Sequence, residues 1–78
     1  MSTETTEKQL VSECARYLRS QYGETLVRYD IEVNDVEDGE GKLTMECTVR
    51  AGGDDSRWRK TFTFEGGRVV DMAWHYLG

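Results

Sequence analysis

The chain has 78 residues and a mass of 9.0 kDa, which is enough for one domain and too little for a second core. It carries 15 acidic and 10 basic residues. The resulting net charge of -5 argues against nucleic acid as a partner, because nucleic-acid-binding surfaces are usually strongly basic. Hydrophobic residues make up 37% of the sequence, which disfavours disorder, but no apolar run approaches the ~20 residues of a membrane span.

The first residues and the cysteines indicate the cellular setting. Residues 1–7 are polar and acidic, unlike a signal or transit peptide, and we expect residues 1–5 to be disordered ahead of a single domain. Two cysteines cannot build the disulfide framework of a small secreted scaffold. We therefore expect a cytoplasmic protein in which Cys14 and Cys47 are buried free thiols, each packed as a small hydrophobe.

Residues 6–22 predict one amphipathic helix. Its apolar residues recur at spacings of three and four and so share one face; they are Leu10, Val11, Cys14, Ala15, Leu18 and Tyr22. Thr6 and Gln9 have the spacing of a capping box, and Gly23 is a natural end for the helix.

After Gly23 the apolar residues alternate with polar ones, which predicts strands. Four runs show this alternation: Val27 to Asn34, Leu43 to Arg50, Arg57 to Phe64, and Arg68 to Leu77. The connections, at residues 37–41, 52–55 and 66–67, are short and rich in glycine, so they join antiparallel neighbours. We expect an α+β fold, with one N-terminal helix packed on a four-stranded antiparallel meander.

The first hairpin suggests its own register. Closing it with a loop of residues 39–41 sets Asp30 opposite Arg50 and Ile31 opposite Val49. Charged side chains then pair on the wet face and apolar ones pair under the helix.

The last hairpin has two candidate registers. A two-residue Gly66–Gly67 turn puts Phe62 and Phe64 on the face opposite a stripe formed by Val70, Met72, Trp74 and Tyr76. A three-residue loop with a bulge brings both sets to one face, in the core. The small size of the chain favours the second register, because such a domain needs nearly every large apolar side chain in its core. In the first register the stripe is exposed and is a partner or dimer surface.

The segment Arg57–Val70, with the sequence RWRKTFTFEGGRVV, carries a resemblance to a known family. A Trp, an alternating aromatic strand, an acidic-Gly turn and a basic-Val strand resemble the closing hairpin of the cystatin-like superfold, which includes the nuclear-transport-factor-like domains. The resemblance implies that fold, with dimerisation through the sheet or a ligand on its concave side. Residues 49–53 read Val-Arg-Ala-Gly-Gly where protease-inhibiting cystatins carry Gln-x-Val-x-Gly, so protease inhibition is not implied.

No arrangement of residues predicts catalysis. His75 is the only histidine, and Asp71 lies four residues before it on the same face of a strand. A nucleophile would have to come from Cys47, Cys14 or a threonine on another strand, and no nucleophile motif surrounds any of them. We expect a protein that is not an enzyme.

Metal ligands are not predicted either. The two cysteines and the histidine lack the short paired spacings of a zinc site. Counted as a calcium loop from Asp30, the sequence has Asp35 at the glycine position and Gly41 where the closing glutamate belongs. We expect no metal and no cofactor.

Two surfaces are candidates for binding a partner. Six acids between residues 30 and 41 make the first hairpin acidic, and Arg57 and Arg59 are expected to pair with acids of neighbouring strands. We expect an interaction module that binds a protein, or itself as a homodimer, through the sheet or this acidic hairpin; one version is an inhibitor of a basic surface. The candidate residues are Asp30, Glu32, Asp35, Glu37, Asp38, Glu40, Arg57, Arg59, Trp74 and Tyr76.

The alternative is a small-molecule-binding domain of the cystatin-like kind. Its pocket would lie between the helix and the sheet. The side chains expected to line it are Tyr29, Met45, Trp58 and Trp74.

Overall fold

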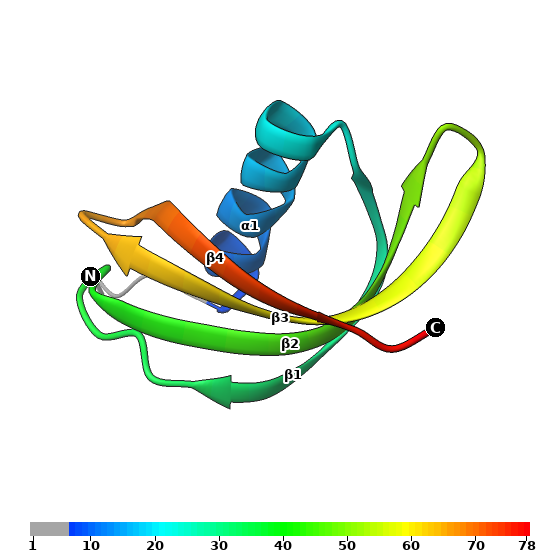
Figure 1. Cartoon of the computed structure of the whole chain (residues 1–78). Coiled ribbons are helices and arrows are strands. Elements are labelled where there is room, and N and C mark those ends of the chain that lie inside the picture. Colours follow the sequence, from blue (N-terminus) through cyan, green and yellow to red (C-terminus); the bar gives the residue numbers. More distant parts are fainter. Residues whose placement is uncertain (1–6) are drawn as a thin grey trace.

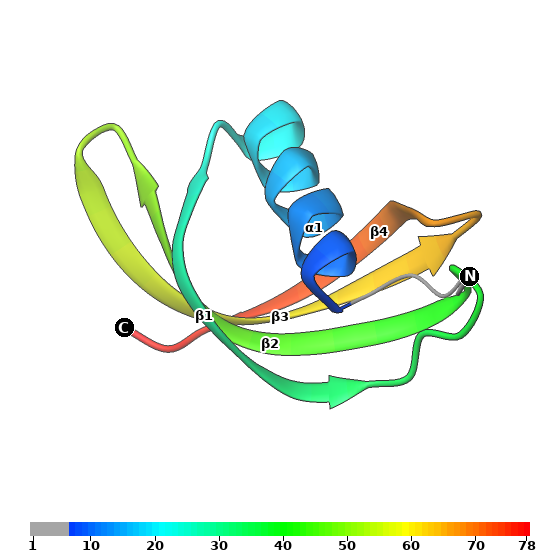
Figure 2. The same ribbon diagram turned by 180° about the vertical axis from the view of Figure 1, so that it is seen from behind.

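A computed structural model of the chain describes residues 7–78 and confirms the predicted α+β fold. The helix and strands follow one another as α1 (Glu7–Tyr22), β1 (Thr25–Asn34), β2 (Gly41–Ala51), β3 (Asp54–Glu65) and β4 (Arg68–Tyr76). The strands form one antiparallel sheet in the order β1-β2-β3-β4. The sheet is strongly curved and α1 lies on its concave side (Figures 1 and 2). The disorder predicted for residues 1–5, and Thr6 of the predicted capping box, lie outside the described residues.

The helix ends where the sequence predicts. Gly23 adopts a φ of 66°, and its N–H donates to the carbonyl of Arg19 at 3.1 Å. A left-handed glycine after the last turn is a common way to stop a helix, because it has no Cβ to clash. The chain then turns directly into the sheet at Glu24.

The core lies between one face of α1 and the middle of the sheet. The helix contributes Leu10, Val11, Cys14 and Leu18. The sheet contributes Leu43, Met45, Cys47, Val49, Phe62, Phe64 and Met72. Apart from Met72, which lies on β4, these side chains come from the predicted helical stripe and from the predicted alternation of the second and third strands. Tyr22 of the predicted stripe is exposed.

The alternation predicts that Val27, Tyr29, Ile31 and Val33 share the inward face of β1, and this prediction is wrong in part. Val27 and Glu32 have no partner in the register with β2, so each is the extra residue of a bulge. Every bulge reverses the faces of the residues beyond it. As a result Leu26 and Ile31 pack against the core, whereas Val27 and Val33 are exposed.

The predicted register of the first hairpin is also wrong. Asp30 lies opposite Glu46 instead of Arg50, and Ile31 lies opposite Met45 instead of Val49. The cause is the position of the turn: Glu37 bridges Glu40 across Asp38 and Gly39 instead of a loop of residues 39–41. The bulge at Glu32 then shifts the register by one more residue.

The last hairpin combines the two registers that the sequence left open. Its turn is the tight Gly66–Gly67 turn, because Glu65 pairs with Arg68. A bulge at Val70 then restores the register of the other alternative, since Phe62 pairs with Met72 on the concave face. Trp74 and Tyr76 therefore lie on the same face as the core.

Candidate functional site

Three aromatic side chains gather on the concave face beside the C-terminal end of α1. The Trp58 ring lies 5.2 Å from that of Trp74 and 4.8 Å from that of Tyr76, measured between ring centroids, and both contacts are edge-to-face. The indole N–H of Trp58 donates to the Ser56 hydroxyl at 2.8 Å. We call Trp58, Trp74 and Tyr76 the aromatic cluster.

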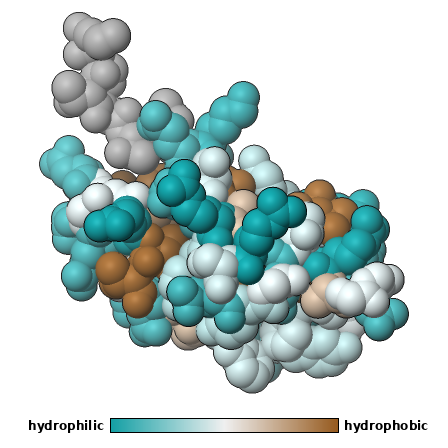
Figure 3. All heavy atoms as spheres, turned by 90° about the horizontal axis from the view of Figure 1, so that it is seen from above, coloured by the Kyte–Doolittle hydropathy of each residue, from teal (hydrophilic) through white to brown (hydrophobic). Residues whose placement is uncertain are grey.

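Trp74 and Tyr76 are not part of the core, although the favoured register predicted that they complete it, whereas Trp58 packs against the core. Trp74 and Tyr76 are each 58% exposed, while Met72 on the same strand is buried. The difference arises because α1 covers only part of the concave face (Figure 1). Seen from the helix side, polar side chains cover most of the surface and apolar ones form separate patches (Figure 3). Bare aromatic rings on such a surface are typical of an interaction site.

A buried ion pair lies beneath the cluster. Lys60 is only 2% exposed, and its Nζ lies 3.3 Å from Oε1 of Glu24. The same Nζ faces the rings of Trp58 at 4.9 Å and Tyr22 at 5.7 Å. The sequence reasoning missed this pair. The sequence does contain a signal for the burial of Lys60, because the strand alternation places it between Trp58 and Phe62 on the inward face.

The two cysteines are buried free thiols, as predicted. Burial raises the pKa of Cys47 to about 11, against a smaller opposing effect of the nearby Lys60 charge. Burial also raises the pKa of Cys14, with Cys47 adding to the effect. Both thiols are therefore protonated near neutral pH, which makes them poor nucleophiles.

The residues considered for catalysis are not brought together. Asp71 and His75 lie opposite Thr63 and Arg59, on the convex face, and both are exposed. The two thiols lie in the core on the other side of the sheet. No cleft among residues 7–78 therefore joins this histidine to a buried thiol.

Arginines and acids pair across the convex face, and Arg57 does so with the neighbouring strand, as predicted. Arg59 contacts Glu32 at 2.8 Å, reaching across β2, and Arg57 contacts Glu46 at 3.3 Å. The Glu32 hydrogen bond raises the pKa of Arg59. Both candidate arginines are therefore engaged within the chain.

The candidate acids do not form one free patch. Glu32 pairs with Arg59, and the carboxylate of Glu40 accepts a hydrogen bond from the backbone N–H of Gly66. The other four are exposed: Asp30, Asp35, Glu37 and Asp38. Two carboxylates of the acidic hairpin thus make contacts within the chain and are not free to bind a partner.

The predicted pocket residues are likewise dispersed. Met45 is completely buried, and Tyr29 is half-exposed on β1. Trp58 and Trp74 belong to the aromatic cluster.

The edge of β4 is open along its length. Within residues 7–78, β4 pairs with β3 alone, and the N–H of Leu77 donates to the carbonyl of Arg57 at 2.8 Å. Antiparallel bonds alternate along a strand, so residues 75, 73 and 71 also turn their backbone groups toward β3. Met72, Trp74 and Tyr76 consequently turn their N–H and C=O groups outward.

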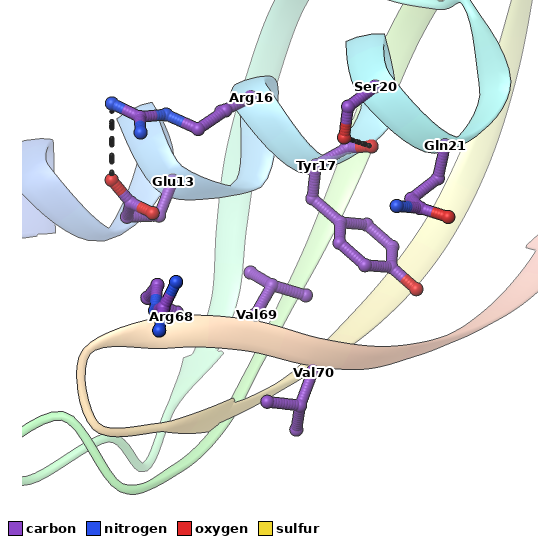
Figure 4. A pocket seen from close by; sticks show the side chains of 8 residues that line it. All are labelled: Glu13, Arg16, Tyr17, Ser20, Gln21, Arg68, Val69 and Val70. Atoms are coloured by element: carbon purple, nitrogen blue, oxygen red, sulfur yellow. Dashed lines mark hydrogen bonds and ion pairs between the residues drawn. The ribbon is translucent and has the colours of Figure 1, made fainter.

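A groove of about 380 Å³ runs between α1 and the first residues of β4. Tyr17 and Val69 point toward each other across it, and Val70 points away from α1 (Figure 4). Its outer wall is polar, with Glu13 and Arg16 3.8 Å apart. The groove therefore lies alongside the same open edge as the aromatic cluster.

Comparison with protein-family models, with curated proteins and with solved structures finds no match. The resemblance to the cystatin-like superfold thus stays a prediction. Within residues 7–78, no group of three or more His, Cys, Asp or Glu side chains is placed to hold a metal ion. In the same part of the chain, the helix is neither long nor apolar enough to span a membrane.

Proposed function

We propose that this protein is a small non-catalytic interaction module that binds another polypeptide along the β4 edge. The observation that carries the proposal is the exposure of Trp74 and Tyr76, each 58%, on an edge strand whose free backbone groups belong to the same residues. An added strand would bond to these groups and cover the rings at the same time. This is the physics of β-strand addition.

Binding at this edge requires both the burial of the aromatic rings and the backbone hydrogen bonds of an added strand. Trp74 and Tyr76 together expose roughly 200–300 Å² of ring surface, and burying it contributes about 5–7 kcal/mol before costs. Association opposes this with an estimated ~4–15 kcal/mol of lost freedom. Ring burial alone is therefore insufficient, and the backbone hydrogen bonds of a paired strand supply the remainder.

The opposite edge of the sheet is built differently. β1 carries two bulges, and it exposes Arg28, Asp30 and Glu32. Bulges and charged side chains are the usual devices that keep an edge strand from pairing. β4 has one bulge near its start and exposes aromatic side chains near its end, so it is the edge suited to binding.

A displayed library of short extended peptides tests the proposal. We expect the protein to select peptides with alternating apolar residues, and Trp74→Ser and Tyr76→Ser to weaken the selected peptides by at least about 10-fold. Tyr29→Ser is the matched control, because Tyr29 is a half-exposed aromatic residue on the other edge strand.

The salt dependence of the binding affinity distinguishes binding at the aromatic β4 edge from charge-driven binding through the acidic hairpin. Binding at the aromatic edge should change little with ionic strength, whereas binding through the acidic hairpin should fall steeply as salt rises. Failure of the monomeric protein to select any peptide, or selection of basic peptides whose affinity ignores Trp74→Ser, would contradict the proposal.

A further inference from the structure

We infer that the polypeptide which occupies the β4 edge is a second copy of this chain, paired antiparallel with its own β4 about a two-fold axis at Ala73. This inference rests on the function proposed above. It names the partner and the register of the interface.

Hydrogen-bond geometry limits the choice of register. The outward groups of Met72, Trp74 and Tyr76 must meet outward groups of the second strand. A two-fold axis at Ala73 satisfies this condition, because it sets Met72 opposite Trp74 of the second copy and Trp74 opposite Met72.

Charge and size select this register among its neighbours. With the axis at Ala73, Asp71 lies opposite His75 of the second copy, so an acid meets an imidazole on both sides of the axis. An axis at Met72 would set Asp71 opposite Ala73, and an axis at Trp74 would set it opposite Leu77. The small Ala73 also suits the axis, because side chains in a non-hydrogen-bonded pair are closest, with Cα atoms about 4.5 Å apart.

The same register places the groove of one copy beside the aromatic cluster of the other copy. Tyr76 of the second copy lies opposite Val70, with its ring on the concave side, where Tyr17 and Val69 line the groove. The half of each sheet that its own helix leaves bare is then bordered by the flank of the other helix. The rings of both copies together expose roughly 400–600 Å², so they can supply at most a large part of the ~1,000 Å² expected of a specific interface.

The resulting assembly is closed. Two four-stranded sheets become one sheet of eight strands, whose outer edges are the two β1 strands. Their bulges and charged residues discourage a further copy from adding. An isologous dimer therefore forms without growth into fibres.

Solution mass is the first test. We expect sedimentation equilibrium, at concentrations up to about 1 mM, to give twice the 9.0 kDa chain mass. Ala73→Arg should shift the protein to monomer, because two guanidinium groups would meet on the axis. Val33→Arg, an exposed apolar residue on the other edge strand, should leave the dimer intact.

Cross-linking tests the register. Ala73→Cys should form a disulfide between copies under mild oxidation, since about 4.5 Å between Cα atoms is within disulfide reach. His75→Cys should not, because its counterpart in the second copy lies four residues along the strand. Efficient cross-linking of His75→Cys, or a dimer that survives Ala73→Arg, would overturn the inference.

The two proposals fail differently. A protein that stays monomeric at high concentration but still binds peptides through Trp74 would refute the dimer and leave the proposed function standing. A monomer that binds no peptide would refute both.

Discussion

The Nζ of Lys60 lies 3.3 Å from Oε1 of Glu24, although only 3% of the lysine side chain and 15% of the glutamate side chain reach solvent. The contact is an ion pair without a well-aligned hydrogen bond to that oxygen. Removing two charges from water costs several kcal/mol per ion, which close pairing and the rings of Trp58 and Tyr22 offset. The pair fixes the end of α1 to the middle of the sheet, directly under the aromatic cluster.

Breaking this pair from one side should be costly. In Lys60→Met the Glu24 carboxylate keeps its burial and loses its cation, so we expect the free energy of unfolding to fall by about 3 kcal/mol in urea titrations. The double variant Lys60→Met/Glu24→Gln should recover most of this loss, because no uncompensated charge remains. Additive effects of the two substitutions would show that the side chains do not interact.

The alternation of the third strand predicted the inward face of Phe62 and Phe64 because every second residue points the same way. The same two-residue alternation places Lys60 on the inward face, but a charged side chain is normally expected at the surface. Its counter-ion could not be found from the sequence, because Glu24 reaches it only through the direction in which the chain leaves the Gly23 cap. A cap predicts where a helix ends and says nothing of what the next side chain meets.

The error on β1 and the register of β4 that the sequence left open have one physical origin. An extra residue at Val27, Glu32 or Val70 leaves an ordinary sequence of apolar and polar residues, yet it reverses every side chain beyond it. The exposure of Trp74 is a separate matter, because it depends on how much of the sheet α1 covers. The number and order of the helix and strands followed from local patterns, whereas the candidate interaction surface depends on these two non-local features.

The first and last turns of the sheet meet at Gly39. A Cβ on this residue would lie 2.5 Å from the backbone nitrogen of Gly67, whose N–H donates to the Gly39 carbonyl at 3.1 Å. Gly39→Ala should therefore separate the two turns and lower the free energy of unfolding by about 3 kcal/mol, the sum of positive-φ strain and a backbone clash.

Gly53→Ala is the matched control for this effect. Gly53 has a φ of 88°, close to the 79° of Gly39, but nothing lies within 4 Å of its Cβ position. Gly53→Ala should lower the free energy of unfolding by about 1 kcal/mol, from conformational strain alone. Equal losses in the two variants would show that the contact between the turns contributes nothing.

The buried thiols should resist modification. Cys14 is completely buried and Cys47 is 2% exposed, so a reagent reaches them only when the core opens. We expect an aromatic disulfide reagent to react about 1,000-fold more slowly in buffer than in concentrated urea, as a marginally stable domain predicts. An introduced thiol at the exposed Ser20 should react at once and serves as the control. Rapid reaction of either native thiol would contradict the packing of the core.

The same burial predicts a loss of stability at high pH. Unfolded thiols ionise near a pKa of 9.0, whereas the pKa of Cys47 in the folded protein is about 11. Above pH 9 the unfolded chain has therefore released a proton that the folded chain keeps, so rising pH favours unfolding. The stabilisation is complete below that pH and declines toward pH 11, by at most about 1.4 kcal/mol per pH unit for each thiol.

Urea titrations across this range, on the native chain and on Cys47→Ala, isolate the thiol. The substitution leaves a small cavity, which lowers stability equally at every pH, and it removes one titrating group. The curve of unfolding free energy against pH should therefore be less steep for Cys47→Ala between pH 9 and 11. Tyrosines and lysines also ionise there, but they are present in both proteins, so their effect cancels in the difference. Parallel curves would mean that the Cys47 thiol titrates alike in the folded and unfolded chains, which its position between α1 and the sheet does not allow.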